Sequence, residues 1–440
     1  MKIFNSNAAS SDAQPSSLPT SAVAKKSGRH ATKKKSNPTT QGLSAILTAV
    51  KSVARDECTR GTHAIPVNAI QLESYLTTKL GGAGNWTVTK TVTAGVTSEY
   101  FRGVNTTSGE QVFVKLAKPT KSGRIQDAGL LTGASEVEFY NTCARSLQGQ
   151  SSSSSTGTST ICDNVRTPKC LIAETSKHGS RYVVVLEDLV QKESATPIRL
   201  VQPGQQLPIS DVQLILGALA EVHANYWQDE DSVPSIYTKR VNRASKFVGM
   251  VMDKAIKENR TVGGLIEPGS DIDRITAATQ KLGGICAMDA MLDELHPDLR
   301  TLVHGDCHSG NIYMTGCEGG ETDVGLLDWQ TYSYGNPLQD VASVLINCLS
   351  VEDFAEHRGE LTEHYLDALR GRGVDINISK GMVHEALCLR TAYYLTGVLL
   401  GIAFVGPEDA ERKAMLDRGW AEIAKKAKVL DLVTFLENCL

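Results

Sequence analysis

The 440-residue sequence lacks any apolar run long enough to cross a bilayer, and its first residues lack the apolar core of a signal peptide. It also lacks a Cys-x-x-Cys pair. Its ten cysteines follow no regular spacing, so neither a zinc cluster nor a disulfide framework is indicated. These absences predict an intracellular, cytoplasmic protein with no membrane span, in a reducing compartment. The rest of the composition, 41% hydrophobic and 21% charged residues, is typical of a globular protein large enough for two lobes and a tail.

Residues 1–42 differ from the rest of the chain, because they are rich in Ser, Thr, Ala, Asn and Pro. They carry seven Lys or Arg and a single acid, Asp12, which leaves a net charge of −10 on the remainder of a chain whose total is −4. Such a segment cannot bury enough apolar surface to fold, so we expect a disordered basic tail. Its Lys25–Lys35 run is compatible with a nuclear-import or polyanion-binding patch, with part of a transit peptide, or with a solvated tail that carries no address.

The densest group of polar motifs begins at His-Gly-Asp, residues 304–306, and continues with Asn311 and Asp328. Residues 311–327 read as a strand, a polar glycine-containing turn and a return strand, and such a hairpin brings its ends together. Asp306, Asn311 and Asp328 should therefore converge. Two carboxylates and an amide suit Mg²⁺, which takes its other ligands from phosphates and water. The alternative is a polar turn whose Asp and Asn cap backbone amides.

The interval between Asp306 and Asn311 also matches the catalytic loop of protein kinases. His-Gly-Asp-x-x-x-x-Asn followed by Leu-Asp-Trp-Gln at 327–330 resembles the aminoglycoside phosphotransferase superfamily, which includes choline kinase-like and ecdysteroid kinase-like enzymes. The resemblance implies an α+β, two-lobed protein-kinase-like fold. We expect a small β-rich, nucleotide-binding N-lobe at 43–189 and a larger, mostly α-helical C-lobe at 190–440 that carries the catalytic loop and the acceptor site.

The resemblance also implies an ATP- and Mg²⁺-dependent kinase that phosphorylates a hydroxyl group of a small molecule, with no requirement for nucleic acid. Asp306 would orient the acceptor hydroxyl and accept its proton, while Asn311 and Asp328 would hold Mg²⁺. His308 lies two residues after the aspartate, where protein kinases have a phosphate-contacting lysine. It is a candidate hydrogen-bond donor to the transferred phosphate, or a turn histidine that pairs with backbone.

Residues 111–116 read as an apolar strand that contains Lys115, and taken alone such a lysine would face solvent. Its order in the chain favours the lysine that holds the α- and β-phosphates, because a helical stretch with Glu136 follows it, where kinases place the partner glutamate. The small-molecule kinases that the chain resembles read Glu-x-x-Phe-Tyr here, so the resemblance favours Glu136 over Glu138. Residues two apart lie about 200° apart around a helix, so only one of these glutamates can face the site.

Two further N-lobe segments resemble nucleotide-binding parts of the superfamily. The turn at 94–98 would lie over the phosphates through Gly95, Thr97 and Ser98, although a plain hairpin explains the same residues. Leu-Glu-Asp-Leu at 186–189 resembles the hinge between the lobes. There the main-chain groups of Glu187 and Leu189 would pair with the adenine edge, unless the two acids merely begin a loop.

The other elements follow from apolar periodicity. The expected strands are 86–93, 100–104, 165–172 and 182–186, and the expected helices are 43–55, 67–80, 210–227, 243–257, 271–282, 286–295, 361–369, 382–400 and 408–436. On the helix at 210–227, His223 follows a core stripe and is expected to pack beneath the catalytic loop rather than to catalyse. Asp340 begins another helix and is expected to hold the site together.

Three alternatives remain open. A protein kinase needs a long segment to dock a peptide, but only eleven residues separate Asp328 from Asp340 and no Ala-Pro-Glu follows. A catalytically inactive, pseudokinase-like binding module would be expected to lack a metal ligand or the lysine, and none is missing. The acidic body is compatible with a cationic acceptor, but Leu-Asp-Trp-Gln differs from the Ile-Asp-Phe-Glu typical of choline kinases.

Overall fold

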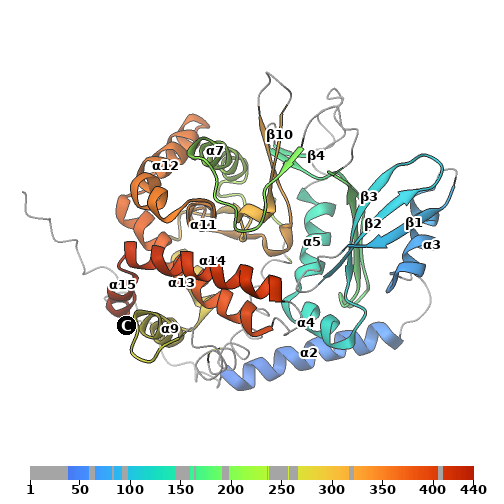
Figure 1. Cartoon of the computed structure of the whole chain (residues 1–440), viewed down its shortest axis with the longest axis horizontal. Coiled ribbons are helices and arrows are strands. Elements are labelled where there is room, and N and C mark those ends of the chain that lie inside the picture. Colours follow the sequence, from blue (N-terminus) through green and yellow to red (C-terminus); the bar gives the residue numbers. More distant parts are fainter. Residues whose placement is uncertain are drawn as a thin grey trace, which may run out of the picture.

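The computed structural model describes residues 38–58, 65–81, 84–91, 98–143, 159–162, 165–190, 198–234, 236, 256, 266–316, 322–404 and 410–440. The chain forms two lobes, one built on a β-sheet and the other mostly of helices (Figure 1). This arrangement confirms the predicted two-lobed, α+β protein-kinase-like fold.

A five-stranded antiparallel sheet in the order β1-β2-β3-β7-β6 forms the first lobe. Its strands are β1 Trp86–Lys90, β2 Ser98–Asn105, β3 Gln111–Ala117, β6 Cys170–Thr175 and β7 Tyr182–Glu187. Because side chains alternate across a strand, β3 sends Val112, Val114 and Leu116 into a core beneath helix α3 (Ala69–Leu80). Phe113 and Lys115 consequently point to the opposite face, where the candidate site lies.

Helices α4 (Lys121–Leu130) and α5 (Thr132–Asn141) cover that opposite face of the sheet, and α4 was not anticipated from the sequence. The two helices meet at Leu131, whose left-handed φ of 57° turns the chain. Phe139 and Tyr140 on α5 are fully buried in the large core that continues into the second lobe. The orientation of α5 is therefore set by packing from both lobes.

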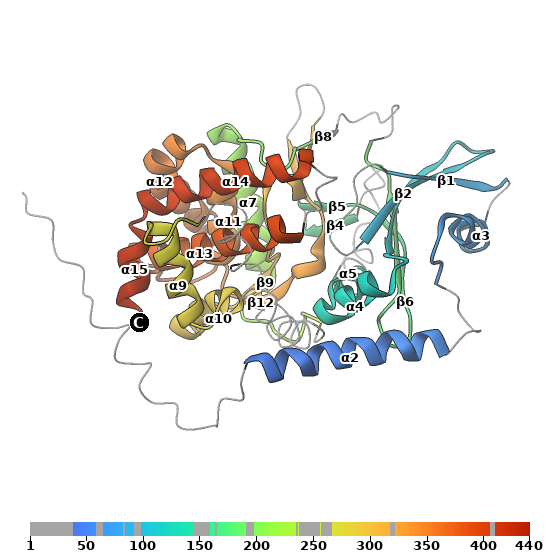
Figure 2. The ribbon, with the colours of Figure 1, turned by 60° about the horizontal axis from the view of Figure 1, so that its bottom comes forward.

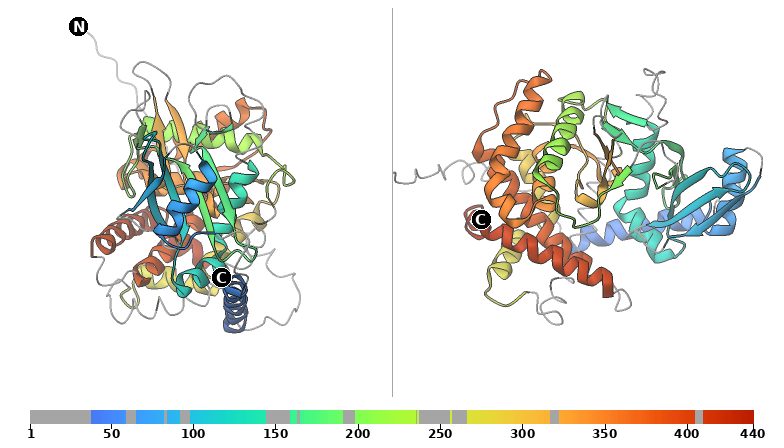
Figure 3. Two further views of the ribbon diagram at one scale, coloured as in Figure 1. Left: turned by 90° about the vertical axis from the view of Figure 1, so that its right-hand side faces the viewer. Right: turned by 45° about the horizontal axis from the view of Figure 1, so that its top comes forward.

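The second lobe consists mainly of helices (Figure 3). They are α7 Ile209–Asn225, α9 Asp271–Lys281, α10 Ile285–Leu295, α11 Leu338–Cys348, α12 Val351–Gly371, α13 Lys380–Phe404, α14 Ala410–Val429 and α15 Leu432–Asn438. Strands β9 (Thr301–Val303) and β12 (Ser333–Gly335) pair as a short ribbon. Along the chain they flank residues 304–332, which contain the His-Gly-Asp motif. None of the described helices is long and apolar enough to cross a membrane.

A second sheet, in the order β4-β5-β11-β10-β8, corrects the strand predicted at 165–172. Its strands are β4 Ser159–Cys162, β5 Val165–Thr167, β8 Ile198–Leu200, β10 Ile312–Thr315 and β11 Asp323–Leu326. The predicted strand divides at Pro168: β5 pairs with β11, whereas β6 joins the first sheet. Proline has no N–H to donate to a ladder, which explains the break. The hairpin predicted between Asn311 and Asp328 is present as β10 and β11.

Two helix predictions also need correction, and a third cannot be compared with the described residues. The helix predicted at 361–369 begins ten residues earlier, at Val351, where the Ser350 side chain accepts a hydrogen bond from the Asp353 amide and caps the first turn. The helix predicted at 408–436 is divided into α14 and α15 by Asp431, which has a φ of 49°. The helix predicted at 243–257 lies outside the described residues, except for Ile256.

The helix predicted near residue 43 is α2, Pro38–Cys58, which begins within the stretch assigned to the tail. It runs along the base of the molecule and packs against α4 (Figure 2). Val53 and Asp56 lie on its buried side. Residues 1–37 lie outside the described part of the chain.

Candidate active site

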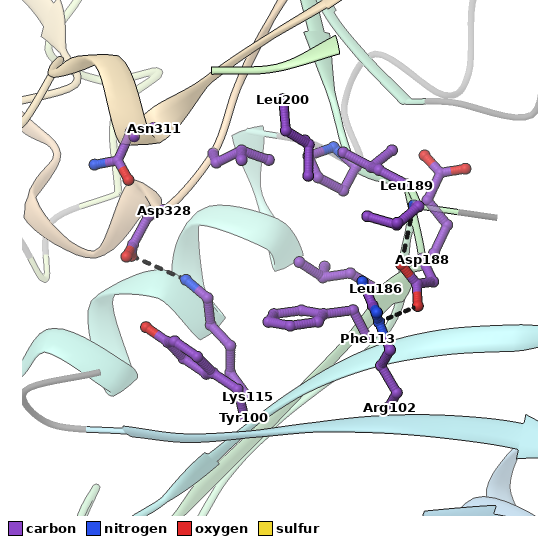
Figure 4. A pocket seen from close by; sticks show the side chains of 15 residues that line it. Tyr100, Arg102, Phe113, Lys115, Leu186, Asp188, Leu189, Leu200, Asn311 and Asp328 are labelled. Atoms are coloured by element: carbon purple, nitrogen blue, oxygen red, sulfur yellow. Dashed lines mark hydrogen bonds and ion pairs between the residues drawn. The ribbon is translucent and has the colours of Figure 1, made fainter. Parts of the chain in front are cut away.

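A pocket of about 240 Å³ lies between the first sheet and the β10–β11 hairpin (Figure 4). Its lining comes from both lobes and comprises Tyr100, Arg102, Phe113, Lys115, Pro168, Leu186, Glu187, Asp188, Leu189, Val190, Leu200, Gly310, Asn311, Leu327 and Asp328. Five of the residues selected from the sequence, Lys115, Glu187, Leu189, Asn311 and Asp328, line this one pocket. An apolar cleft with a few convergent polar groups is a typical site for a small ligand.

Lys115 reaches from β3 into the polar end of the pocket. Its Nζ lies 2.7 Å from Glu136 Oε1 and 2.9 Å from Asp328 Oδ1, so the predicted contact with Glu136 is present and a second carboxylate shares the lysine. Burial lowers the pKa of the Lys115 ammonium, but Asp328 and Glu136 outweigh that effect and hold the pKa well above its usual value. Lys115 is therefore a permanent cation at this end of the pocket.

The two glutamates of α5 have different surroundings. Glu136 is 1% exposed and faces Lys115, whereas Glu138 is only half-buried and is not among the residues that line the pocket. Burial raises the pKa of the Glu136 carboxyl above its usual range, although the Lys115 charge acts in the opposite direction. The choice of Glu136 over Glu138 agrees with this geometry.

The loop that carries Asp306 is held by backbone hydrogen bonds. Gly305 has a φ of 82°, and a Cβ there would approach the Thr331 carbonyl oxygen to 2.5 Å, so only glycine fits. Asn311 Nδ2 donates to the Asp306 carbonyl at 2.9 Å. The Asn311 side chain thus closes the loop through its nitrogen, while its Oδ1 remains to face the pocket that Asn311 lines. The Asp306 carboxylate stays about one-third exposed.

Asp328 lies two residues after the end of β11 and adopts a left-handed backbone conformation, with a φ of 62°. Such a φ is uncommon for a residue other than glycine and tends to occur at functional sites. Its carboxylate points across the pocket to Lys115 (Figure 4). Strand β11 and the loop at 304–311 therefore place Asp328 and Asn311 on one wall, opposite the sheet.

His308 lies beside Asp306, with its Nε2 3.7 Å from Asp306 Oδ2. Its backbone amide donates to the Asp306 carbonyl at 2.9 Å, and its side chain is one-third exposed. The amide thus pairs within the turn, whereas the imidazole lies beside the Asp306 carboxylate, and the role of this side chain stays a prediction.

The hinge segment forms the far end of the pocket. The Glu187 side chain accepts a hydrogen bond from the Lys169 amide at 2.7 Å, and burial raises the pKa of this carboxyl. The adjacent Asp188 is 5% exposed. It accepts from the Val190 amide at 3.0 Å and pairs with Arg102 Nε at 2.8 Å. The sequence analysis did not anticipate the pair between Arg102 and Asp188. Side chains alternate along β2, so Arg102 lies on the same face as Tyr100, and this alternation is the signal that would have found the arginine.

The predicted phosphate-contacting turn is only partly described. Gly95 and Thr97 lie outside the described residues. Ser98 opens β2, is 4% exposed, and its hydroxyl lies 2.6 Å from the Tyr182 hydroxyl. Its side chain is thus engaged on the face of the sheet that α5 covers, and it is not among those that line the pocket.

His223 and Asp340 form a fully buried support below the loop. His223 Nδ1 lies 2.8 Å from the Tyr365 hydroxyl, and its Nε2 lies 3.3 Å from Asp340. Asp340 accepts the amides of His304 and Gly305 at 2.6 and 2.9 Å. Burial alone would raise the pKa of Asp340, but the bonds from His223 and Gly305 hold it below its usual value. The structural positions expected for these two residues agree with this network.

The donor set of the pocket fits a magnesium ion. Asp328 presents a carboxylate at this end of the pocket, beside the Lys115 cation. Asn311 adds an amide oxygen. No group of three or more His, Cys, Asp or Glu in the described chain could hold a metal alone. Mg²⁺ characteristically binds through one or two carboxylates and substrate phosphates, for which Asp328 and Asn311 suffice.

Residues 91–373 match the protein family described as ecdysteroid kinase-like. No curated protein sequence matches the chain.

Solved structures with a similar arrangement include small-molecule kinases. A candidate aminoglycoside phosphotransferase from Ralstonia eutropha is 16% identical, with 83% of this chain and 99% of that one covered and a TM-score of 0.47. An aminoglycoside phosphotransferase in complex with GDP and kanamycin is 14% identical, with coverages of 80% and 97% and a TM-score of 0.43. A Plasmodium vivax ethanolamine kinase is 12% identical, with coverages of 76% and 82% and a TM-score of 0.43.

Proposed function

Because the chain belongs to the ecdysteroid kinase-like family, we propose that it transfers the γ-phosphoryl group of Mg²⁺-bound ATP to a hydroxyl group of a small molecule. The observation that carries this proposal is the arrangement of Lys115 between Glu136 and Asp328, on a pocket that Asn311 also lines. A buried cation shared by two carboxylates adds little stability for its desolvation cost, so its presence in a pocket supports a ligand role.

In this proposal ATP occupies the pocket with its base toward the hinge. Apolar side chains of Phe113, Leu186 and Leu327 would contact the base, and the main chain of Glu187 and Leu189 would pair with its edge. Lys115, oriented by Glu136, would hold the α- and β-phosphates. Asn311 and Asp328 would hold Mg²⁺, which when bound neutralises the phosphate charge.

Asp306 would act at the acceptor. Its carboxylate would accept a hydrogen bond from the acceptor hydroxyl and take the proton as the new oxygen–phosphorus bond forms. The bond from the γ-phosphorus to the β–γ bridging oxygen breaks, and ADP leaves with that oxygen. His308, beside Asp306, would donate a hydrogen bond to the transferred group. Because phosphoryl transfer has a loose transition state, positioning and charge stabilisation supply most of the catalysis.

A small acceptor is favoured over a protein acceptor by the segment between Asp328 and Asp340. It is short, and β12 within it pairs with β9, so it is incorporated into the C-lobe. A kinase that docks peptides needs a longer segment at this point.

The proposal is tested by ADP release from Mg²⁺-ATP in a screen of hydroxylated metabolites. We expect at least one acceptor to raise ADP release, and Asp306→Asn to abolish that increase while ATP affinity stays within about threefold, because Asp306 does not line the nucleotide pocket. An acceptor-dependent rate that Asp306→Asn leaves unchanged would remove Asp306 from the mechanism. A chain that binds ATP but transfers to no acceptor would instead be a binding module.

A further inference from the structure

A buried arginine of α13 contacts the loop that carries Asp306. Arg390 is 1% exposed, and each nitrogen of its guanidinium has a partner. Nε donates to Ser343 Oγ at 2.8 Å, Nη1 donates to both carboxylate oxygens of Asp289 at 2.8 and 3.1 Å, and Nη2 donates to the Gly305 carbonyl oxygen. Helices α10, α11 and α13 therefore meet at one side chain that ends on the loop.

Burying this cation is costly unless its donors are satisfied, because arginine cannot shed its proton. Here the planar fork is filled, and the guanidinium also lies over two aromatic rings, 4.2 Å from the centroid of Tyr393 and 5.0 Å from that of Tyr394. Lysine could not reproduce this set of directions, since its ammonium is a point charge without the fork. The surroundings are thus specific for arginine in one orientation.

The bond to Gly305 fixes the peptide that leads into Asp306. Arg390 holds the carbonyl of that peptide, and its N–H, which belongs to Asp306, donates to His304 Nδ1 at 3.2 Å. The preceding peptide is held through the Gly305 amide by Asp340. Two consecutive peptide planes are therefore held by side chains, and the direction in which Asp306 leaves the backbone depends on them.

We propose that Arg390 is a positioning residue for phosphoryl transfer, acting through the Gly305 carbonyl on the orientation of the Asp306 carboxylate. Asp289 keeps the guanidinium in place. This role rests on the proposed function, since it concerns the group that would receive the acceptor's proton. Arg390 does not line the nucleotide pocket, so its loss should affect the transfer step and leave nucleotide binding unchanged. A displacement of the order of 1 Å at a reacting group costs roughly 100-fold in rate.

The experiment uses the full chain and compares Arg390→Met with Leu389→Ala. Leu389 is the adjacent residue of α13 and is equally buried, but its apolar side chain has no donor for the Gly305 carbonyl, so its truncation destabilises the lobe without removing that bond. For each variant we would measure the unfolding midpoint, the Kd for Mg²⁺-ADP, and the initial rate of ADP formation from Mg²⁺-ATP with water as the acceptor, per folded molecule.

We expect Arg390→Met to lower the rate by roughly 100-fold and to leave the ADP Kd within about twofold, whereas Leu389→Ala retains the wild-type rate at a comparable loss of unfolding midpoint. Arg390→Lys should recover part of the rate. If Arg390→Met does not fold, Asp289→Asn serves instead, because its side chain is 34% exposed and the change is nearly isosteric. We expect it to lower the rate about tenfold at an unchanged ADP Kd.

Equal losses of rate in Arg390→Met and Leu389→Ala would overturn the positioning role and leave only a structural one. If Arg390→Met or Asp289→Asn retains the wild-type rate, the positioning role is also overturned, while the proposed function stands. A wild-type rate no higher than that of Asp306→Asn, both with water and with every acceptor of the metabolite screen, would overturn the proposed function, and the positioning role with it.

Discussion

Lys115 Nζ lies within 3 Å of two carboxylates, Glu136 on α5 and Asp328 after β11. In such an arrangement one cation holds two elements of different lobes. At the scale of single residues, the polar end of the pocket therefore depends on the lysine more than on either acid.

We expect Lys115→Met to weaken Mg²⁺-ATP binding by about 1.5–3 kcal/mol, roughly ten- to a hundredfold in Kd, because a charge-assisted contact to phosphate is lost. Glu136→Gln should cost less, since Glu136 only orients the lysine, and the double variant should be little worse than Lys115→Met alone. Titration calorimetry with the non-hydrolysable nucleotide measures each value.

Glu138→Ala is the matched control for this series, because it alters the same helix two residues away on a half-exposed position. A large loss of affinity in Glu138→Ala together with a silent Glu136→Gln would show that the helix presents the other glutamate. Full affinity in Lys115→Met would exclude the lysine from nucleotide binding.

At the scale of elements, three rings connect α5 to the loop at 304–311. Phe139 lies one turn after Glu136 and stacks on Trp329, with centroids 4.3 Å apart and planes 6° apart. Trp329 follows Asp328 in sequence, and its ring lies 4.6 Å from that of His304. All three side chains are fully buried. The stack therefore sets the distance between the helix that carries Glu136 and the wall that carries Asp328.

We expect Trp329→Ala to destabilise the fold by about 3–5 kcal/mol and also to weaken Mg²⁺-ATP binding by the molecules that remain folded. Trp86→Ala is the control, because Trp86 is equally buried but packs beneath α3 on the other face of the sheet. It should cause a similar loss of stability with normal ATP affinity. Denaturant melts and nucleotide titrations at a temperature where both variants are folded would decide, and equal ATP affinities would show that the stack is a core contact only.

At the scale of the whole molecule, helix α2 precedes the first sheet in the chain and is bonded to the edge of that sheet. Asp56 on α2 is 6% exposed and accepts four hydrogen bonds from the β6–β7 turn: from Ser176 Oγ, the His178 amide, and the amide and hydroxyl of Ser180. Burial alone would raise the pKa of Asp56, but these bonds hold it below its usual value.

We expect removal of residues 1–37 to leave the unfolding midpoint within about 2 °C, whereas Asp56→Ala should lower the free energy of unfolding by about 2–4 kcal/mol at pH 7. The folded-state pKa lies below the unfolded value of about 3.9, so the contribution of Asp56 is complete above that pH and is lost as the pH falls through the folded-state pKa. The difference between wild type and Asp56→Ala should therefore shrink in acid. A difference that persists unchanged at the lowest pH at which both proteins fold would show that the carboxylate charge is not involved.

The parts of the site that follow from local sequence are those whose geometry is set within a few residues. The loop from His304 to Asn311 contains a positive φ at Gly305 that favours glycine, and the Asn311 side chain closes the loop on the Asp306 carbonyl. The β10–β11 hairpin then brings Asp328 back beside this loop. The alternation of β3 likewise determines which face Lys115 occupies. Each of these is a short-range consequence of residue type and spacing, and each could be predicted.

Contacts between distant segments required the tertiary structure. The predicted strand at 165–172 is divided at Pro168 between two sheets. This division could not be predicted from local sequence, because β11, the partner of β5, lies far along the chain. The Asp188 pair with Arg102 and the Arg390 bond to Gly305 join residues 86 and 85 positions apart, and nothing in the local pattern of an arginine indicates its partner. The sequence by itself thus determined which chemical groups the site contains. The packing of α5, α10 and α13 decided which of those groups touch, because side-chain partners over long separations depend on how whole helices are seated.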